Sequence, residues 1–570
     1  MKRFLLTLLA SVIGCLPLLA QDQEPPSVSV APPEAIANWQ DMRFGMFVHW
    51  GPVSLKGTEI GWSRGREVPI EEYDALYKQF NPVNFDAAEW ARVAKAAGMK
   101  YLVLTTKHHD GFCLWDSAAT EYDIMSTPFG RDVVKELSEA CRKEGIAFGT
   151  YYSSCDWYHP AFPLGSPGGR MEKPNPDLEA YGAYLQQQTT ELVTKYGPLL
   201  TIWFDVPQSY GADLGIPMAT NLRDMQPGIL FNNRIYAEPG RTKKFSQQRA
   251  VGDYDTPEQR IGAYQDDRPW ETCMTICRQW AWKPDDKMKS LQECIRTLVT
   301  CAGGNGNLLF NVGPMPDGRI EMRQVERLKE MGKWLEKHGE SIYGTRGGPI
   351  KPGPGFVTTR KGNTMYLHVL PEAPDPIELP ALPCKIVNAE IIGGEEVTIQ
   401  TRNDSWLVSL PDAARQPIDT VVRITLDRPV MDLVAIEAPK EFGPATASHV
   451  FREDHGRYGP GKAFDGNPST RWAVDAGTRE CWLQAQLAKP APIRGIEIDE
   501  TPEYAGRVVK FSLKVKSGTQ WVTVAEGEKL GKFRAEFDPV KATAIRLEIS
   551  SAMDGPNISE VRVLRVSKLR

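Results

Sequence analysis

One unit repeats along the chain from about residue 39 to residue 344: a short apolar run rich in β-branched or aromatic residues alternates with an amphipathic stretch. Repeated β-α units of this kind predict a parallel sheet with right-handed crossovers. The clearest helices and strands are expected at Asp86–Ala97, Tyr101–Thr106, Arg131–Lys143, Ile146–Tyr152, Leu178–Tyr196 and Leu199–Phe204. Since roughly 300 residues of such units are enough for a closed barrel, we expect an α/β fold with a (β/α)8-like barrel over residues 32–345.

The pattern changes after this region. Pro352–Gly355 is typical of a linker, and the stretch that follows alternates with period two, as in Thr364–Val369. A second break, near residue 440, leads into further short strands separated by Gly and Pro turns. Period-two alternation predicts antiparallel β structure. We therefore expect two all-β sandwich domains, at residues 346–436 and 440–570.

The first twenty residues differ in kind from the rest of the chain. Two basic residues precede an apolar run that ends in small residues at Ala20, and polar residues follow. This pattern predicts a secretory signal peptide at residues 1–20 rather than a membrane span. A second interpretation stays open, because Val12–Cys15 resembles a bacterial lipobox and would leave Cys15 as a lipid anchor. Both interpretations predict an exported protein, in the periplasm or at the cell surface.

Composition excludes some classes of partner. The formal net charge of −5 gives no electrostatic reason to expect nucleic acid or an anionic membrane surface. The nine cysteines after Cys15 are scattered, and no pair has the Cys-x-x-Cys spacing of a zinc site. We expect buried or free thiols and at most one disulfide among them. The 15 tryptophans suit stacking on sugars, although Trp is also an ordinary core residue.

Polar and aromatic side chains gather where the predicted strands end. In a parallel barrel the active site lies at the carboxyl ends of the strands, so these residues are the candidates. They are His49, Trp50, Lys107, His108, His109, Asp110, Ser153, Trp203, Asp205, Asn233 and Arg234. A metal site is disfavoured, because these candidates show no His-x-Glu or His-x-x-x-His spacing. A purely structural role is the usual explanation for one such residue, but not for five strand ends that all carry such residues. A sugar site explains the set, because hydroxyls bind His, Asp and Arg, and glycosidic cleavage requires two carboxyl groups.

Six motifs of the first domain, in order, resemble the glycoside hydrolase 29 α-L-fucosidase family. They are Phe44–Gly51, Lys107–Phe112, Tyr151–Ser153, Ile202–Asp205, Trp270–Thr275 and Gly303–Leu309. The resemblance implies a retaining exo-α-L-fucosidase that acts on fucosylated oligosaccharides or glycoconjugates and needs no cofactor for catalysis. It implies Asp205 as the nucleophile. It also implies a set of substrate-binding residues: His49, Trp62, His108, His109, Tyr152, Trp203, Arg234 and Trp280.

Two glutamates compete for the role of acid/base. Glu258 lies in Thr-Pro-Glu-Gln shortly after Asn-Asn-Arg, where the related sequences place their proton donor. Glu271 belongs to a more recognisable motif, but its apolar and cysteine neighbours suit a buried structural acid. We choose Glu258 and keep Glu271 as the alternative. In the retaining mechanism the carboxyl groups of Asp205 and the acid/base are expected to lie about 5–5.5 Å apart.

Some residues depart from the family pattern. Val206 and Pro207 follow Asp205 where many relatives have glycine, and Trp280-Ala281-Trp282 replaces the usual Trp-Gly-Tyr. These changes leave open a related galactosidase or D-fucosidase on the same scaffold. A catalytically silent glycan-binding protein is the alternative of a different class, although both candidate acids are present.

The third predicted domain has its own resemblance. Ala463–Trp472 resembles the F5/8 type C (discoidin-like) domains, many of which are carbohydrate-binding modules. The resemblance implies a structural Ca²⁺ site with Asp465 and Ser469 as candidate ligands. Glycan binding and a spacer role both stay open for this module.

Overall fold

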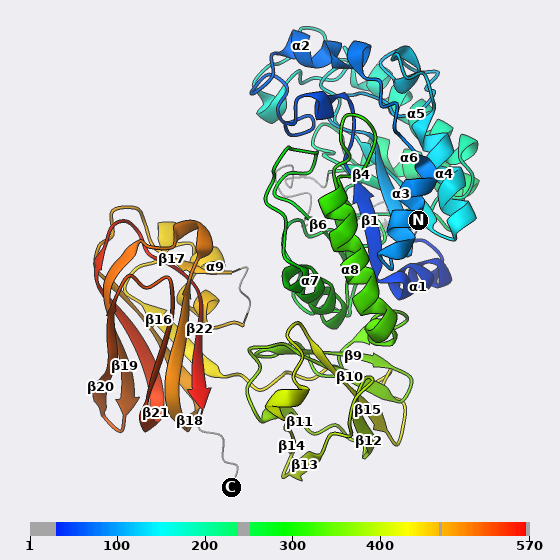
Figure 1. The fold of residues 1–570 in the computed structure, drawn as a ribbon. Coiled ribbons are helices and arrows are strands. Elements are labelled where there is room, and N and C mark those ends of the chain that lie inside the picture. The colour runs from blue at the N-terminus through cyan, green and yellow to red at the C-terminus, as the bar shows by residue number, and fades with distance from the viewer. Residues whose placement is uncertain (1–29, 238–250, 467–469, 566–570) are drawn as a thin grey trace, which may run out of the picture.

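The computed structural model describes residues 30–237, 251–466 and 470–565, and Figure 1 shows three successive parts of the chain. The first part is built on a seven-stranded parallel sheet in the order β5-β4-β3-β2-β1-β7-β6. Its strands are β1 (Phe44–Val48), β2 (Tyr101–Lys107), β3 (Ala147–Ser153), β4 (Thr201–Asp205), β5 (Leu230–Phe231), β6 (Glu271–Thr275) and β7 (Asn307–Val312). The predicted α/β class is confirmed.

A short segment joins the two edge strands of this sheet. Asn232, directly after β5, forms a parallel bridge with Tyr254, and Asp255 forms one with Trp270, directly before β6. Residues 254–255 thus lie where an eighth barrel strand belongs, and they complete the ring with single bridges instead of a regular strand. Sequence periodicity did not reveal this segment because it is too short to alternate.

Helices surround the sheet (Figure 1). They are α1 (Pro33–Met42), α2 (Ile70–Ala75), α3 (Ala87–Ala96), α4 (Val133–Glu144), α5 (Leu178–Lys195), α6 (Ala212–Met225), α7 (Leu291–Gly303) and α8 (Met322–His338). Side chains cap several of them: Asp86, Asp132 and Asp177 each accept the backbone N–H three residues on, and Ser290 forms a capping box with Glu293. The predicted helices and strands of this part are present, with ends that differ by at most two residues.

Strand side chains alternate between two apolar cores. Phe47, Val103, Tyr151 and Trp203 point into the barrel and form one cluster. Their neighbours, such as Phe204, point outward and pack against the helices in a much larger cluster. This alternation decides which residues at the strand ends face the site, because successive side chains of a strand lie on opposite faces.

The second part is antiparallel, as predicted. A five-stranded sheet, in the order β12-β15-β10-β9-β8, accompanies a three-stranded one in the order β11-β14-β13. The strands are β8 (Arg346–Gly347), β9 (Phe356–Lys361), β10 (Thr364–Val369), β11 (Ile377–Pro380), β12 (Ile386–Ile391), β13 (Ile399–Arg402), β14 (Ser405–Val408) and β15 (Thr420–Leu426). The part adjoins the barrel closely, since Val357 of β9 packs in the barrel's outer core beside Gly303 of α7.

The third part is a seven-stranded antiparallel sheet with its own core. It comprises β16 (Phe442–Ala447), α9 (His455–Tyr458), β17 (Trp472–Ala473), β18 (Cys481–Glu500), β19 (Val508–Ser517), β20 (Gln520–Glu528), β21 (Lys532–Ala552) and β22 (Asn557–Arg565). The long strands β18 and β21 pair twice, on either side of a register shift between Gln486 and Ala491. An irregularity of this kind bends the strands. Before it β18 pairs with β16, and after it β18 pairs with β22.

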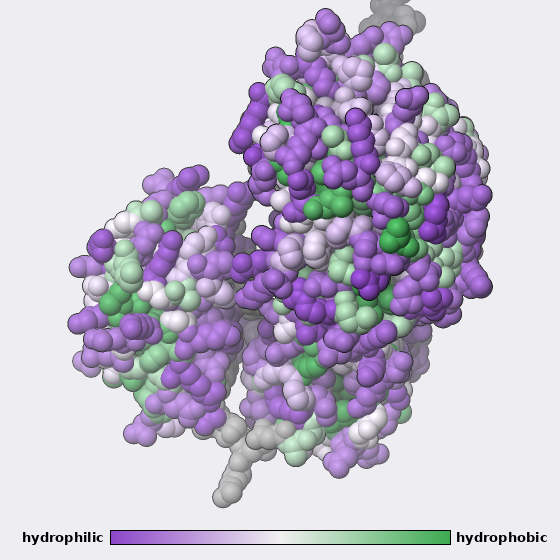
Figure 2. All heavy atoms as spheres, turned by 45° about the horizontal axis from the view of Figure 1, so that its top comes forward, coloured by the Kyte–Doolittle hydropathy of each residue, from purple (hydrophilic) through white to green (hydrophobic). Residues whose placement is uncertain are grey.

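Figure 2 shows a mainly hydrophilic surface on the face in view, with hydrophobic residues in small scattered patches. None of the helices within the described ranges is long and apolar enough to span a membrane. The nine cysteines from Cys113 to Cys481 are free thiols, and all but Cys384 are buried. The predicted signal peptide and Cys15 lie outside the described residues.

Candidate active site

Asp205 is the last residue of β4, and three donors hold its carboxylate. Oδ1 accepts hydrogen bonds from Arg234 Nη1 at 2.8 Å and from the backbone N–H of Val206 at 2.9 Å. Oδ2 accepts one from the Tyr151 hydroxyl at 2.8 Å. Val206 adopts φ +53°, a left-handed conformation that is unusual for a β-branched residue. The backbone at the strand end is therefore strained at the point where the amide binds the carboxylate.

Arg234 joins the two candidate catalytic carboxylates. Its Nη1 binds Asp205, and its Nη2 lies 3.1 Å from Glu258 Oε2. Thr256 fixes the guanidinium further, through a hydroxyl 2.9 Å from Nε and a carbonyl 3.0 Å from Nη2. The central carbon of the Arg234 guanidinium, Cζ, lies 4.6 Å from the ring centroid of Trp203. Because these contacts fix the planar guanidinium, Arg234 determines where the carboxylates of Asp205 and Glu258 lie relative to each other.

The electrostatics of this group favour an ionised nucleophile. Burial alone would raise the pKa of Asp205, but the charge of Arg234, with His109 and Tyr151, lowers it below its ordinary value. Burial acts to lower the pKa of Arg234, and the charges of Asp205 and Glu258 raise it. The Asp205 side chain is 12% exposed, whereas that of Glu258 is 43% exposed. Asp205 is thus enclosed by protein, and Glu258 borders solvent.

The three predicted histidines lie together beside Asp205. The His49 ring is 5.6 Å from the His108 ring, which is 4.0 Å from that of His109. His49 Nδ1 pairs with Asn311 Oδ1 at 2.6 Å, and His109 Nδ1 with the Ser153 hydroxyl at 2.7 Å. His109 Nε2 lies 3.8 Å from Asp205 Oδ2.

Burial keeps these imidazoles neutral. It lowers the pKa of His49 to about 3 and that of His109 to about 4, and it lowers the pKa of His108 well below its ordinary value. A neutral imidazole offers one donor and one acceptor nitrogen. Each ring therefore has hydrogen-bonding capacity to offer a sugar hydroxyl, and adjacent positive charges do not build up.

Trp62 and Trp280 lie at the edge of this group, on two different loops. Trp62 is 38% exposed, and its ring meets the His109 ring edge-on at 5.4 Å. The Trp280 ring lies 4.7 Å from the His49 ring. Glu59, which sequence reasoning missed, joins the two loops: its carboxylate accepts the backbone N–H groups of Ile60, Trp280 and Ala281. Burial raises the pKa of Glu59.

The prediction that Tyr152 binds substrate is wrong, because the strand alternation turns it away from the site. The Tyr152 hydroxyl donates to Gln188 Oε1 at 2.8 Å on the outer face of the barrel. Tyr151, one residue earlier, pairs with Trp203 in the sheet and points to the same side as Asp205. Counting back two residues from the ends of β3 and β4 would have identified Tyr151.

Glu271 lies at the other end of the barrel. It begins β6, where it pairs with the first residue of β7, and its side chain accepts from the Tyr101 hydroxyl and from Trp203 Nε1. Burial raises its pKa to about 7. Glu271 thus supports the barrel interior, while Glu258 shares Arg234 with Asp205.

The candidate calcium ligands are only partly described. Asp465 accepts the Thr470 hydroxyl, and Ser469 lies outside the described residues. Glu560, which sequence reasoning missed, lies nearby: burial and the charge of Asp465 raise its pKa to about 8. Its Oε2 is buried and has no hydrogen-bond partner among the described residues. Within those residues no group of three or more His, Cys, Asp or Glu side chains is arranged to hold a metal.

The comparisons with known proteins agree with this geometry. A family model described as Alpha-L-fucosidase matches residues 17–340, more than half of the chain. The chain belongs to the alpha-L-fucosidase family. Human plasma alpha-L-fucosidase is 31% identical over 335 residues, which cover 54% of this chain and 69% of that protein. A second model, the F5/8 type C domain, matches residues 444–563.

Solved structures of alpha-L-fucosidases share the fold. Isoenzyme 1 from Paenibacillus thiaminolyticus is 34% identical with a TM-score of 0.63, and the match covers 69% of this chain and 99% of that one. An alpha-L-fucosidase GH29 from Bacteroides thetaiotaomicron, trapped as a covalent intermediate with 2-fluoro-fucosyl fluoride, is 27% identical with a TM-score of 0.63. That match covers 70% of this chain and 98% of the other.

Proposed function

We propose that this protein is a retaining exo-α-L-fucosidase that releases terminal α-L-fucose from glycans through a covalent fucosyl-enzyme intermediate. The observation that carries the proposal is the single guanidinium of Arg234, which binds both Asp205 and Glu258 at the carboxyl ends of the barrel strands. Glycoside hydrolysis requires two carboxyl groups at one glycosidic bond. Membership of the alpha-L-fucosidase family supports L-fucose as the sugar.

In the first step Asp205 attacks the anomeric carbon while Glu258 protonates the leaving oxygen. We assign the attack to Oδ2. Each carboxylate oxygen has two lone-pair sites, and both sites of Oδ1 are already filled by Arg234 and Val206. Oδ2 accepts only the Tyr151 hydroxyl among the described residues, so it retains a lone pair for the carbon.

In the second step Glu258, now a base, takes a proton from water, and the water oxygen bonds to the anomeric carbon as the bond between the sugar and Asp205 breaks. Fucose is released with net retention, and Asp205 is again ionised. Its 43% exposure suits this role, because water reaches the carboxylate directly. We assign His49, His108 and His109 to the sugar hydroxyls, and Trp62 and Trp280 to its apolar surfaces. No cofactor enters either step.

The test is hydrolysis of p-nitrophenyl α-L-fucoside by the wild type and by Asp205→Asn. We expect release of nitrophenol by the wild type and no turnover by the variant. Glu258→Gln is expected to retain the first step on this activated leaving group and to lose it on natural glycans. If the wild type cleaves α-galactosides or D-fucosides but not L-fucosides, the assignment of the sugar is wrong. If every glycoside fails while L-fucose still binds, the protein is a glycan-binding protein.

A structural Ca²⁺ in the third part is a separate proposal. The orphaned oxygen of buried Glu560 beside Asp465 supports it, since hard cations bind carboxylate oxygens. In the wild-type protein, addition of Ca²⁺ is expected to raise the temperature at which the third part melts. This rise is expected to vanish in Glu560→Gln. An equal rise in both proteins would contradict the site.

We also propose export from the cytoplasm, on the composition of residues 1–20. The two forms, soluble and lipid-anchored, differ at Cys15. Metabolic labelling with a fatty acid distinguishes them: label that disappears in Cys15→Ala indicates an anchor, and no label on the exported protein indicates plain cleavage.

A further inference from the structure

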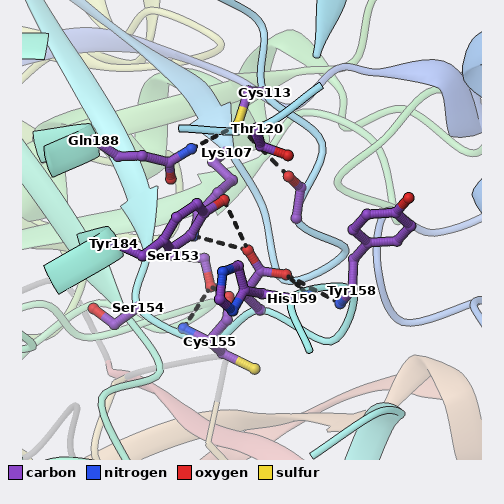
Figure 3. A network of polar contacts seen from close by, with 12 residues as sticks. Lys107, Cys113, Thr120, Ser153, Ser154, Cys155, Tyr158, His159, Tyr184 and Gln188 are labelled. Atoms are coloured by element: carbon purple, nitrogen blue, oxygen red, sulfur yellow. Dashed lines mark hydrogen bonds and ion pairs between the residues drawn. The ribbon is translucent and has the colours of Figure 1, made fainter. Parts of the chain in front are cut away.

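A buried ion pair lies behind the site, on the outer face of the barrel. Lys107 Nζ is 3.2 Å from Asp156 Oδ2, and the two side chains are 0% and 1% exposed. The ammonium also lies 4.4 Å and 5.1 Å from the ring centroids of Tyr152 and Tyr184, and the Tyr184 hydroxyl donates to the same Asp156 oxygen at 3.4 Å. Figure 3 shows Lys107 and Tyr184, the two labelled side chains that bind this carboxylate, side by side.

Stability does not explain this pair. Taking two charges out of water costs several kcal/mol per ion, and apolar residues of similar volume often replace such a pair with neutral or favourable effect. The aromatic surroundings of Lys107 would accept a methionine in the same volume. We therefore explain the presence of the pair by the two loops that it holds in place.

Lys107 anchors the loop that carries two of the histidines. The pairing of β2 with β3 shifts between Thr105 and Lys107, so Thr106 is an extra residue in β2. Such a bulge re-aims the side chains that follow it. Here Lys107 points outward to the pair, and His108 and His109 follow directly at the site.

Asp156 anchors the next loop. Its Oδ1 accepts the backbone N–H groups of Tyr158 at 3.0 Å and His159 at 2.8 Å, which fixes the turn that contains Trp157 (Figure 3). The Trp157 amide donates to the His109 carbonyl at 2.8 Å, and its ring meets the His109 ring at 5.3 Å. One oxygen of Asp156 thus binds the loop after β3, and the other binds Lys107, the last residue of β2 before the loop that carries His108 and His109.

We propose that Lys107 and Asp156 are positioning residues of the site: their ion pair fixes the two loops against each other and thereby holds Trp157 against His109, and His109 in place beside Asp205. The proposal rests on the function proposed above, because His109 is assigned to a sugar hydroxyl. It goes beyond that function in giving a role to two buried charges that touch neither substrate nor nucleophile.

The experiment compares Lys107→Met, Asp156→Asn and the double variant with the wild type. Three quantities are measured: the melting temperature, the KM and kcat for p-nitrophenyl α-L-fucoside, and the calorimetric Kd of L-fucose. Each single variant leaves one buried charge unpaired, so its melting temperature falls. The double variant restores charge balance and a near wild-type melting temperature. We nevertheless expect its Kd for L-fucose to stay raised by about tenfold, because displacement of His109 weakens a hydrogen bond to the sugar and the loss of one such bond, about 1.4 kcal/mol, is a tenfold loss of affinity.

A double variant with both the melting temperature and the Kd of the wild type would overturn the proposal. If the double variant does not fold, Lys107→Arg decides, because it keeps the charge and changes the geometry. We expect its Kd for L-fucose to rise at least about threefold, because the displaced His109 makes a weaker hydrogen bond to the sugar, and an unchanged Kd would overturn the proposal. Binding of L-fucose needs no turnover, so a wild type that binds but does not hydrolyse would refute only the proposed function.

Asp253→Asn is the matched control. Asp253 is also a buried aspartate that binds one cation, Arg223 at 3.0 Å, and two backbone N–H groups, those of Ala31 and Phe231 at 2.7 Å. It lies at the amino end of the sheet, away from the site. We expect it to lower the melting temperature without changing the Kd of L-fucose. An equal rise in Kd for Asp253→Asn and Asp156→Asn would overturn the proposal.

Discussion

Replacing Arg234 by methionine separates the two effects that set the charge of the nucleophile. Burial favours the protonated form of Asp205, and the guanidinium 2.8 Å away favours the ionised form and prevails. Activity requires the ionised form, so it is lost as the pH falls through the pKa of Asp205 in the folded protein. Without the guanidinium, burial dominates and that pKa rises. The acidic limb of the pH–rate profile must therefore move to higher pH.

The size of the shift follows from the geometry. An opposite charge at this distance lowers the pKa of a carboxyl by about 1–3 units, so its removal should move the limb upward by about 1–3 pH units. Each unit corresponds to about 1.4 kcal/mol and a tenfold change in rate. At a pH on the limb, kcat/KM should thus fall about 10- to 1000-fold further than it does on the plateau.

The assay is kcat/KM for p-nitrophenyl α-L-fucoside from pH 3 to pH 8, with pH values spaced at roughly half a unit. Arg223→Met is the control, because Arg223 is also buried, pairs with Asp253 at 3.0 Å and lies 4.6 Å from the ring centroid of Phe231. It should lower stability and leave the limb where it is. A limb that does not move in Arg234→Met would refute the reasoning, as would an equal movement in the control.

Further predictions concern two other buried groups. Tyr151→Phe removes the hydrogen bond to Asp205 Oδ2 and should lower kcat/KM about 10- to 100-fold, since such bonds to charged groups contribute about 1.5–3 kcal/mol. Tyr196→Phe, which removes a similar bond to Asp132 far from the site, should change it less than about twofold, and an equal loss would contradict the role of Tyr151. For Glu271, burial raises the pKa from 4.5 to about 7, so its contribution to stability is present below pH 4.5 and is lost as the pH rises through 7. The free energy of unfolding of the wild type relative to Glu271→Gln should accordingly fall by about 3 kcal/mol between pH 4.5 and pH 8 in urea titrations, and a constant difference would contradict the assigned pKa.

The regular strands and helices of the barrel could be predicted because each is marked by a pattern within its own stretch of sequence. Strands such as Tyr101–Lys107 are wholly buried and begin with an apolar run, and the helices between them carry capping residues such as Asp86 and Asp132. The segment at Tyr254 and Asp255 was not predictable from periodicity, because two bridging residues carry no repeat.

The site was predictable in position and only partly in detail. Strand ends identified Asp205, Arg234 and the histidines, since the fold brings all carboxyl ends together. The choice of Tyr152 over Tyr151 failed because a one-residue error along a strand exchanges its two faces. Glu59 carries no local signal, because its three partners are backbone amides and two of them lie more than 200 residues away in sequence.

The most direct test of the account is to trap the intermediate on this protein. The wild type is incubated with 2-fluoro-fucosyl fluoride, and the labelled peptide is sequenced by mass spectrometry. We predict one 2-fluoro-fucosyl group per chain, attached to Asp205, and no label in Asp205→Asn. A label on any other residue, or turnover of L-fucosides that persists in Asp205→Asn, would contradict the assignment of the nucleophile.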